Sequence, residues 1–135
     1  MALTKERNTI ARDGKSISAP VAAAKKILAG ALVALDASGN VTPGAVSATL
    51  KKPGRAPLTV DNSTGAAGDQ KSDIEFGVFL WKNSASADAI TRADIGNNCY
   101  IVDDETVAKT SDTNARSVAG KVFDVETNGV WVDQR

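Results

Sequence analysis

Turn-forming residues interrupt this sequence at short intervals and so limit the length of any regular element. Clusters of glycine, proline, asparagine and aspartate include residues 36–40, 43–44, 51–54, 61–65 and 128–129. The apolar runs between them are mostly of strand length, and several alternate apolar with polar residues, which is typical of β-strands. Residues 88–95 favour one short helix, which Asp88 caps and Gly96 ends. The sequence therefore predicts a small, mostly β domain of barrel or sandwich-like architecture with one short helix.

The most apolar segment covers residues 27–35, where both faces of an extended strand carry apolar side chains. Such a strand is buried on both faces. The core of this 135-residue chain is thin, because much of its apolar content is alanine, which buries little area per side chain. A second subunit is a candidate cover for the face with Leu28 and Leu32, and we assign both residues to a predicted oligomer interface.

A second strand signal covers residues 73–81, where the alternation assigns each side chain to one of two faces. The core face is predicted to carry Ile74, Phe76, Val78 and Leu80. The opposite face begins with Asp73 and Glu75 and ends with Phe79 and Trp81. Two large aromatic residues thus lie on a face that the pattern marks as polar.

The clearest hairpin signal is the Asn128-Gly129 dipeptide, which is typical of type I′ turns, between strands over residues 118–127 and 130–133. A two-residue loop there predicts a core face with Phe123, Val125, Val130 and Val132. Trp131 then lies on the polar face. For Phe79, Trp81 and Trp131 two interpretations stay open: loops or a second layer cover them, or they anchor a subunit interface.

Residues 1–14 are predicted to form an N-terminal arm, followed by one β-rich domain over residues 15–135. The arm carries Lys5, Arg7 and Arg12 but only two large aliphatic residues, Leu3 and Ile10, in no regular period. Two interpretations again stay open, because termini are often disordered and because an extended segment can also order on a partner.

Composition excludes several classes of function. The chain has no histidine, which removes histidine-based catalysis, histidine-ligated zinc and histidine pH switching. Sixteen basic residues balance sixteen acidic ones, so a nucleic-acid partner is not expected. No apolar signal region or run of eighteen apolar residues is present, so a membrane partner is not expected either. The sequence predicts synthesis in a cytoplasm, with Cys99 buried and reduced.

Carboxylates supply the remaining candidates for chemistry, and none of them is convincing. The run Asp103-Asp104-Glu105 lacks calcium-loop spacing, so a solvated turn is expected there and no metal site. The pairs Asp73 with Glu75, and Asp124 with Glu126, share strand faces, but nothing in the sequence surrounds one carboxylate with apolar residues. We therefore predict no catalytic residue, no cofactor and no enzymatic activity.

Several segments resemble small capsid decoration (cement) proteins of tailed phages, and together they span nearly the whole chain. They are Arg7-Asn8-Thr9 with Asp13-Gly14, Pro20-Val21-Ala22-Ala23, residues 27–35, Asp61-Asn62-Ser63, Gly77-Val78-Phe79, residues 88–96, residues 99–104, residues 117–122 and Gly129-Val130-Trp131-Val132. These motifs are structural, and they name no active site.

The resemblance implies a small, β-tulip-like fold that forms a homotrimer on the outer surface of the expanded capsid of a bacteriophage. Such proteins clamp neighbouring subunits of the major capsid (coat) protein and are made in the cytoplasm of the host bacterium. In lambda-type relatives an N-terminal arm engages the coat protein. By this resemblance we assign capsid contact to the polar residues of the arm, Lys5, Arg7, Asn8, Thr9 and Arg12.

Two other classes of function remain as alternatives. A virion surface module that binds a receptor or glycan would use exposed tryptophans to stack on sugars. A small enzyme would use paired carboxylates such as Asp124 and Glu126. The expected function is the structural one, a virion protein that stabilises the mature capsid.

Overall fold

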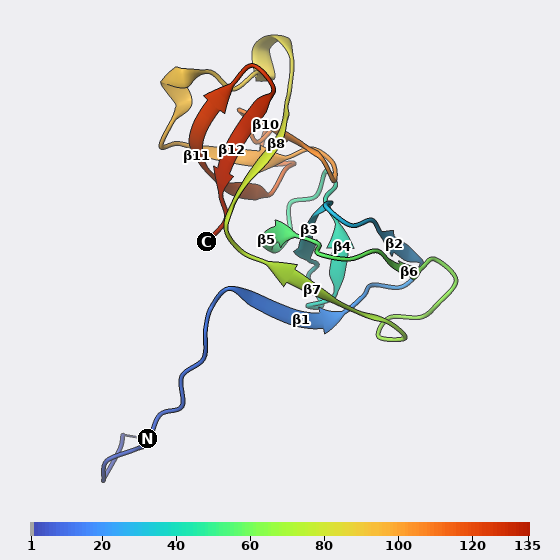
Figure 1. The fold of residues 1–135 in the computed structure, drawn as a ribbon, viewed down its shortest axis with the longest axis vertical. Helices are drawn as coiled ribbons and strands as arrows, with labels where there is room; N and C mark the ends of the chain where they lie inside the picture. Colours follow the sequence, from blue (N-terminus) through green and yellow to red (C-terminus); the bar gives the residue numbers. More distant parts are fainter. Residues whose placement is uncertain (1) are drawn as a thin grey trace.

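The structure is a computed structural model that describes residues 2–135, so Met1, the first residue of the predicted arm, lies outside the described residues. The chain forms two β-lobes, and the arm runs away from both (Figure 1). We name residues 2–14 the arm, residues 15–75 the sheet lobe and residues 78–135 the barrel. The predicted mostly β fold with a small barrel is confirmed.

The sheet lobe contains an antiparallel sheet with strand order β1-β7-β5-β3-β4 and a separate two-stranded sheet of β2 and β6. Its strands are β1 (Ser16–Pro20), β2 (Lys25–Ile27), β3 (Leu32–Leu35), β4 (Val41–Pro43), β5 (Lys51–Arg55), β6 (Val60–Asn62) and β7 (Lys71–Glu75). The arm leads into β1, which is an edge strand and pairs with β7 from Ser16 opposite Glu75 to Pro20 opposite Lys71. The arm therefore leaves the body at an edge of the sheet.

The barrel closes five strands in the order β10-β8-β12-β11-β9. These strands are β8 (Val78–Asn83), β9 (Asn98–Ile101), β10 (Thr106–Ala108), β11 (Val118–Glu126) and β12 (Gly129–Asp133). A parallel pairing of β10 with β8 completes the ring, and the other pairings are antiparallel. Its interior is apolar and includes Trp81, Ile101, Val107, Val130 and Val132. Closure leaves the barrel without an edge strand.

Strand β3 contributes to both apolar cores. Leu32 and Ala34 join the barrel cluster, whereas Val33, between them, joins the cluster of the sheet lobe. The prediction of a segment buried on both faces is confirmed for these residues. The expected cover by a second subunit is wrong for Leu32, which is 0% exposed, because the barrel of the same chain covers that face.

The single strand predicted over residues 27–35 is divided in the structure. Strand β2 ends at Ile27, and a turn follows in which the Ala31 N–H donates to the Leu28 carbonyl over 3.1 Å. Gly30 within this turn has a φ of 87°, a conformation that other residues rarely adopt. Periodicity alone does not reveal such a break, because the apolar pattern continues through it.

The predicted facing of residues 73–81 is correct for the first half only. Ile74 on β7 is buried in the sheet lobe, but on β8 it is Trp81 that is buried, with 5% of its surface exposed. Strand β7 ends at Glu75 and β8 begins at Val78, so the chain passes from one lobe to the other between them (Figure 1). The barrel interior lies on the side of the chain opposite to the one that faces the core of the sheet lobe. On β8, the positions predicted to point outward therefore point inward, and those predicted to point inward point outward.

The predicted hairpin forms between β11 and β12, but its turn lies one residue earlier, so each residue of β11 near the turn pairs two residues earlier on β12 than predicted. Glu126 pairs with Gly129, so the loop residues are Thr127 and Asn128. A β-bulge between Val122 and Asp124 then leaves Phe123 with 55% of its surface exposed. The assignment of Phe123 to the core is therefore wrong. The glycine is required by packing, since a Cβ at this position would meet the Trp81 carbonyl oxygen.

The helix predicted over residues 88–95 is also wrong. Two single 3₁₀ turns form instead, η1 (Ser86–Asp88) and η2 (Arg92–Asp94). Between them Ile90 is buried, and the Asn83 side chain accepts from its N–H and donates to its carbonyl, each over 2.8 Å. These tertiary bonds satisfy the backbone of Ile90 in place of helical bonds. Asp88 caps no helix and instead accepts from Thr110 and Arg116.

Candidate functional site

The five polar residues assigned to capsid contact lie in the arm, and all of them are exposed. Lys5, Arg7, Asn8, Thr9 and Arg12 follow one another along a segment in which every residue from 2 to 14 is exposed and none belongs to a strand or helix. Figure 1 shows this segment projecting from the start of β1. The body leaves these side chains available for a partner.

The cations of the arm are also unpaired within the described part of the chain. The ion pair at the base of the arm joins Lys15 to Asp13 over 3.7 Å, and it is highly exposed. Lys5, Arg7 and Arg12 take part in no such pair among residues 2–135. Three positive charges therefore lie in solvent on an exposed segment, without a carboxylate partner among the described residues.

The residues assigned to an oligomer interface separate into buried and accessible groups. Leu32 and Trp81 belong to the barrel core, so their assignment to a surface is wrong. Leu28 is 53% exposed in the turn between β2 and β3. Phe79 and Trp131 are half-buried.

Phe79 is already engaged within the chain. The Arg55 guanidinium lies over its ring at 4.4 Å from the centroid, and the ring meets Trp81 edge to face at 6.3 Å. Arg55 also forms an ion pair with Glu75 over 3.0 Å. These contacts tie strand β5 of the sheet lobe to strand β8 of the barrel, so Phe79 contributes to holding the two lobes together.

Trp131 differs from Trp81 in its environment. It pairs across the strands with Leu80 and Asp124, on the outer face of the barrel. The bulge next to Asp124 adds Phe123 to the accessible aromatic residues, and periodicity could not find it because a bulge breaks the alternation. Of the two tryptophans, Trp131 is therefore the one available to a partner.

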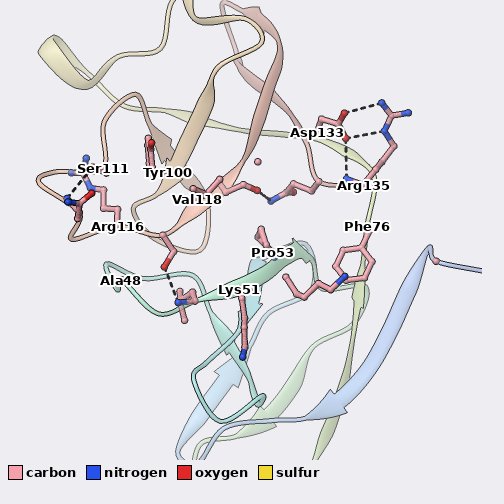
Figure 2. Close-up of a pocket in the computed structure, with 18 residues that line it drawn as sticks. Ala48, Lys51, Pro53, Phe76, Tyr100, Ser111, Arg116, Val118, Asp133 and Arg135 are labelled. Carbon is pink, nitrogen blue, oxygen red and sulfur yellow. Dashed lines mark hydrogen bonds and ion pairs between the residues drawn. The ribbon is translucent and has the colours of Figure 1, made fainter. Parts of the chain in front are cut away.

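A cleft of about 730 Å³ lies between the two lobes (Figure 2). One wall comes from β5 and the segment before it, and the other from β9, β11 and the loop that precedes β11. Its lining is Gly14, Ala48, Leu50, Lys51, Lys52, Pro53, Phe76, Tyr100, Ser111, Asn114, Arg116, Ser117, Val118, Ala119, Gly120, Asp133, Gln134 and Arg135. Sequence reasoning did not find this cleft, because its residues come from segments far apart in the chain.

Two hydrogen bonds of one buried hydroxyl fix the floor of the cleft. The Ser117 hydroxyl donates to the Ser47 carbonyl over 2.6 Å and accepts from the Leu50 N–H over 2.9 Å. Ser117 lies just before β11 of the barrel, whereas both of its partners precede β5 of the sheet lobe. The walls are thus held at a fixed separation by a bond network as well as by the shared core.

Several charged groups at the cleft are paired. Arg116, 13% exposed, donates to Asp88 over 3.2 Å, and the Thr110 hydroxyl donates to the same carboxylate. These two bonds hold the pKa of Asp88 below its usual value. Arg135 donates in the same way to Asp133 and lowers its pKa. Each arginine therefore has a carboxylate of its own.

At the cleft, one further group lacks a hydrogen-bond partner, and two lysines lack an ion-pair partner. Nε of Arg116 is, among residues 2–135, the buried side-chain nitrogen or oxygen that lacks a hydrogen-bond partner. Lys51 and Lys52 of β5 take part in no ion pair within the same residues. Lys52 lies over the Phe76 ring at 5.4 Å from the centroid, whereas the Lys51 side chain points away from the barrel wall (Figure 2).

The acidic run considered as a metal site has local partners instead. Asp103 accepts from the Glu105 N–H over 2.9 Å, and Glu105 forms an ion pair with Lys82 over 3.0 Å. Asp124 is held by Arg92 over 3.0 Å. Across residues 2–135 no group of three or more metal-ligating side chains comes together.

Cys99 lies in the barrel core and is fully buried. Burial raises the pKa of its thiol to about 12, so the reactive thiolate is not formed at neutral pH. This placement agrees with the expectation of a small, inert core residue.

Comparison with protein-family models, curated proteins and solved structures finds no match for this chain. In the described residues no helix has the length and apolar character needed to cross a membrane. The features of the chain that bear on its function are therefore the arm, the barrel surface and the cleft, together with the sequence resemblance.

Proposed function

We propose that this chain is a capsid decoration protein that binds the outer surface of the expanded capsid of a tailed phage and stabilises it. The observation that carries the proposal is the arm, in which every residue from 2 to 14 is exposed and none belongs to a strand or helix. An extended segment of this kind can order on a second protein and add contact area to that of the compact body. The sequence resemblance and the small β fold support the same function.

The partner in this proposal is the major capsid protein, and the contact residues of the arm are Lys5, Arg7, Asn8, Thr9 and Arg12. Stabilisation follows from mass action, since a protein that binds only the mature lattice shifts the equilibrium toward that lattice. Weak contacts repeated around a closed shell add through multivalency. The protein is made in the host bacterial cytoplasm and resides on the outer surface of the virion.

Self-association as a homotrimer completes the proposal, because the symmetry of a trimer can match a threefold position of the lattice. Trp131 on the barrel face and Leu28 in the turn after β2 are its interface candidates. Sedimentation equilibrium of Trp131→Ala tests this interface. We expect dissociation with an unchanged far-UV circular dichroism spectrum, and an intact trimer would exclude Trp131 from the interface.

Electron microscopy of the protein added to purified expanded capsids and to unexpanded shells tests the function. We expect added density at regular positions on expanded capsids and none on unexpanded shells. Absence of density on expanded capsids would refute the proposal.

A triple variant, Lys5→Ala with Arg7→Ala and Arg12→Ala, tests the arm. The matched control removes three exposed lysines of the sheet lobe, Lys25, Lys26 and Lys71. We expect occupancy on capsids to fall at least several-fold for the arm variant and to stay unchanged for the control. Equal occupancy of the two variants would remove the cations of the arm from the mechanism.

A further inference from the structure

Strand β1 borders the sheet lobe, and the outer edge of its first half is open (Figure 1). The Phe76 N–H donates to the Lys15 carbonyl over 2.9 Å, and the same antiparallel register with β7 continues along β1. Because such residues alternate between hydrogen-bonded and non-hydrogen-bonded pairs, the odd-numbered residues of β1 direct their backbone groups at β7. The backbone N–H and carbonyl groups of Ser16 and Ser18 therefore point away from β7, toward the open edge.

The described part of the chain leaves these backbone groups without a partner. Ser16 and Ser18 are exposed, and among residues 2–135 the pairing of β1 as a strand is with β7 alone. The far end of the edge is covered, because the Ala22 N–H donates to the Val41 carbonyl of β4 over 2.9 Å. Pro20 also lacks an N–H, which protects that end from pairing. Two N–H donors and two carbonyl acceptors are thus left for a strand from outside.

The arm of the same chain does not supply this strand as a tight hairpin. Asp13-Gly14 is a signal for a two-residue turn, which would make Arg12 and Lys15 exchange hydrogen bonds. The backbone groups of Lys15 are directed at β7, however, and Gly14 lacks the positive φ that such a turn requires. The chain instead bends at Gly14 and Lys15 and leads the arm away from the sheet (Figure 1).

The open edge of β1 is complementary to the same edge of a second copy. We name the line along which two such edges would meet the seam. If the edges pair antiparallel about a twofold axis at Ile17, Ser16 of each copy lies opposite Ser18 of the other. These serines direct their backbone groups at the seam in both copies, so each of the two serine pairs exchanges two hydrogen bonds.

The side chains at the seam fit the same arrangement. Ile17 would lie opposite Ile17 of the second copy, in a non-hydrogen-bonded pair, where side chains approach most closely. It is half-buried against the core of the sheet lobe, so the contact would complete its burial. On the other face the hydroxyls of Ser16 and Ser18 would be cross-strand neighbours. Lys15 would lie opposite Ala19, so no like charges oppose each other there.

We propose that the open edge of β1 pairs with the β1 edge of a second copy of this chain and joins two sheet lobes into one continuous sheet. This inference rests on the proposed function, because a twofold contact cannot lie within a threefold trimer and so connects neighbouring trimers on the capsid. The ladder is too short to bury the area that a stable free dimer needs. It therefore acts where the lattice holds copies side by side, through multivalency.

Cysteine cross-linking measures the register of this contact. In Ile17→Cys the two thiols lie opposite each other at the closest pair of the seam, within the reach of a disulfide. In Ser16→Cys or Ser18→Cys they lie diagonally across the seam, about 7–8 Å apart. The natural Cys99 is buried and does not compete. After copper–phenanthroline oxidation, in concentrated solution and on expanded capsids, we expect several-fold more disulfide dimer for Ile17→Cys than for either serine variant.

A second pair of variants tests the main-chain bonds. Ser18→Pro, added to Ile17→Cys, removes the N–H that points at the seam, whereas the pairing with β7 uses no backbone group of Ser18. The matched control is Ser18→Ala, which keeps that N–H. We expect cross-linking to fall at least several-fold with proline and to stay unchanged with alanine, while both variants keep the far-UV circular dichroism spectrum of the parent chain.

Equal yields for the three cysteine variants, or a yield that proline leaves unchanged, would overturn the proposal, because they would indicate random collision. If Ser18→Pro lowers capsid occupancy but Ile17→Cys does not cross-link, the occupant of the edge is a coat-protein strand and not a second copy. Normal capsid density for Ile17→Cys without cross-linking would refute the β1 contact and leave the decoration function standing. Cross-linking in solution without capsid binding would keep the contact and refute the decoration function.

Discussion

Replacing Gln134 with leucine should destabilise the barrel strongly, although the residue lies beyond the last strand. Its side chain is 4% exposed, accepts from the Trp81 indole N–H over 2.9 Å and donates to the Ala119 carbonyl over 3.0 Å. Leucine has a similar volume but makes neither bond, so one buried donor and one buried acceptor lose their partner. At about 1–3 kcal/mol for each group, less the gain from added apolar burial, the expected loss is about 2–4 kcal/mol.

Urea unfolding followed by tryptophan fluorescence measures this loss directly. The matched control is Gln70→Leu, the same exchange at an exposed glutamine of the sheet lobe, for which we expect a change of less than about 0.5 kcal/mol. A parallel thermal melt should show the midpoint of Gln134→Leu falling by roughly 5–15 °C. If the two variants lose the same stability, the two buried hydrogen bonds of Gln134 do not stabilise the barrel.

Three further perturbations test other parts of the structure. Gly54→Ala should cost about 1–3 kcal/mol in urea unfolding, because the added Cβ would overlap the Glu75 carbonyl oxygen, whereas Gly14→Ala has open space and should cost little. Cys99 should react with Ellman's reagent only on unfolding, since its thiol is buried with a pKa of about 12, and rapid reaction of the native protein would contradict this. The pKa of Asp88 is lowered from 3.8 by its hydrogen bonds to Thr110 and Arg116. The ionised carboxylate therefore contributes fully to the free energy of unfolding above pH 3.8, and this contribution is lost as the pH falls through the folded-state pKa. The thermal midpoint of Asp88→Asn should therefore lie below that of the natural chain at neutral pH and converge with it in acid.

The class of fold was predictable from the sequence, because short alternating segments and frequent turns are local properties. Burial of both faces of the segment around Val33 was also predictable, since both faces carry apolar residues. The sequence did not predict which element packs on the second face of this segment. Whether a second subunit or a second lobe of the same chain packs on Leu32 depends on the path of the chain, which periodicity does not contain.

The errors at single residues have equally local causes. Trp81 is buried because the chain changes lobes between β7 and β8, which reverses the faces that alternation had assigned. Phe123 is exposed because a bulge inserts one residue into β11. The cleft was not predictable at all, since Lys51 and Arg116 lie in different lobes and only the fold brings them to one cavity.

Strand β3 has a thermodynamic consequence through its place between the two cores. Because Leu32 and Val33 are neighbours in one strand yet pack into different clusters, neither core can lose its packing without moving a backbone that the other core also holds. The two lobes should therefore unfold as one cooperative unit, with a single transition. Fluorescence, which reports Trp81 and Trp131 in the barrel, and far-UV circular dichroism, which reports both lobes, should give coincident curves, and separate midpoints would show two independent units.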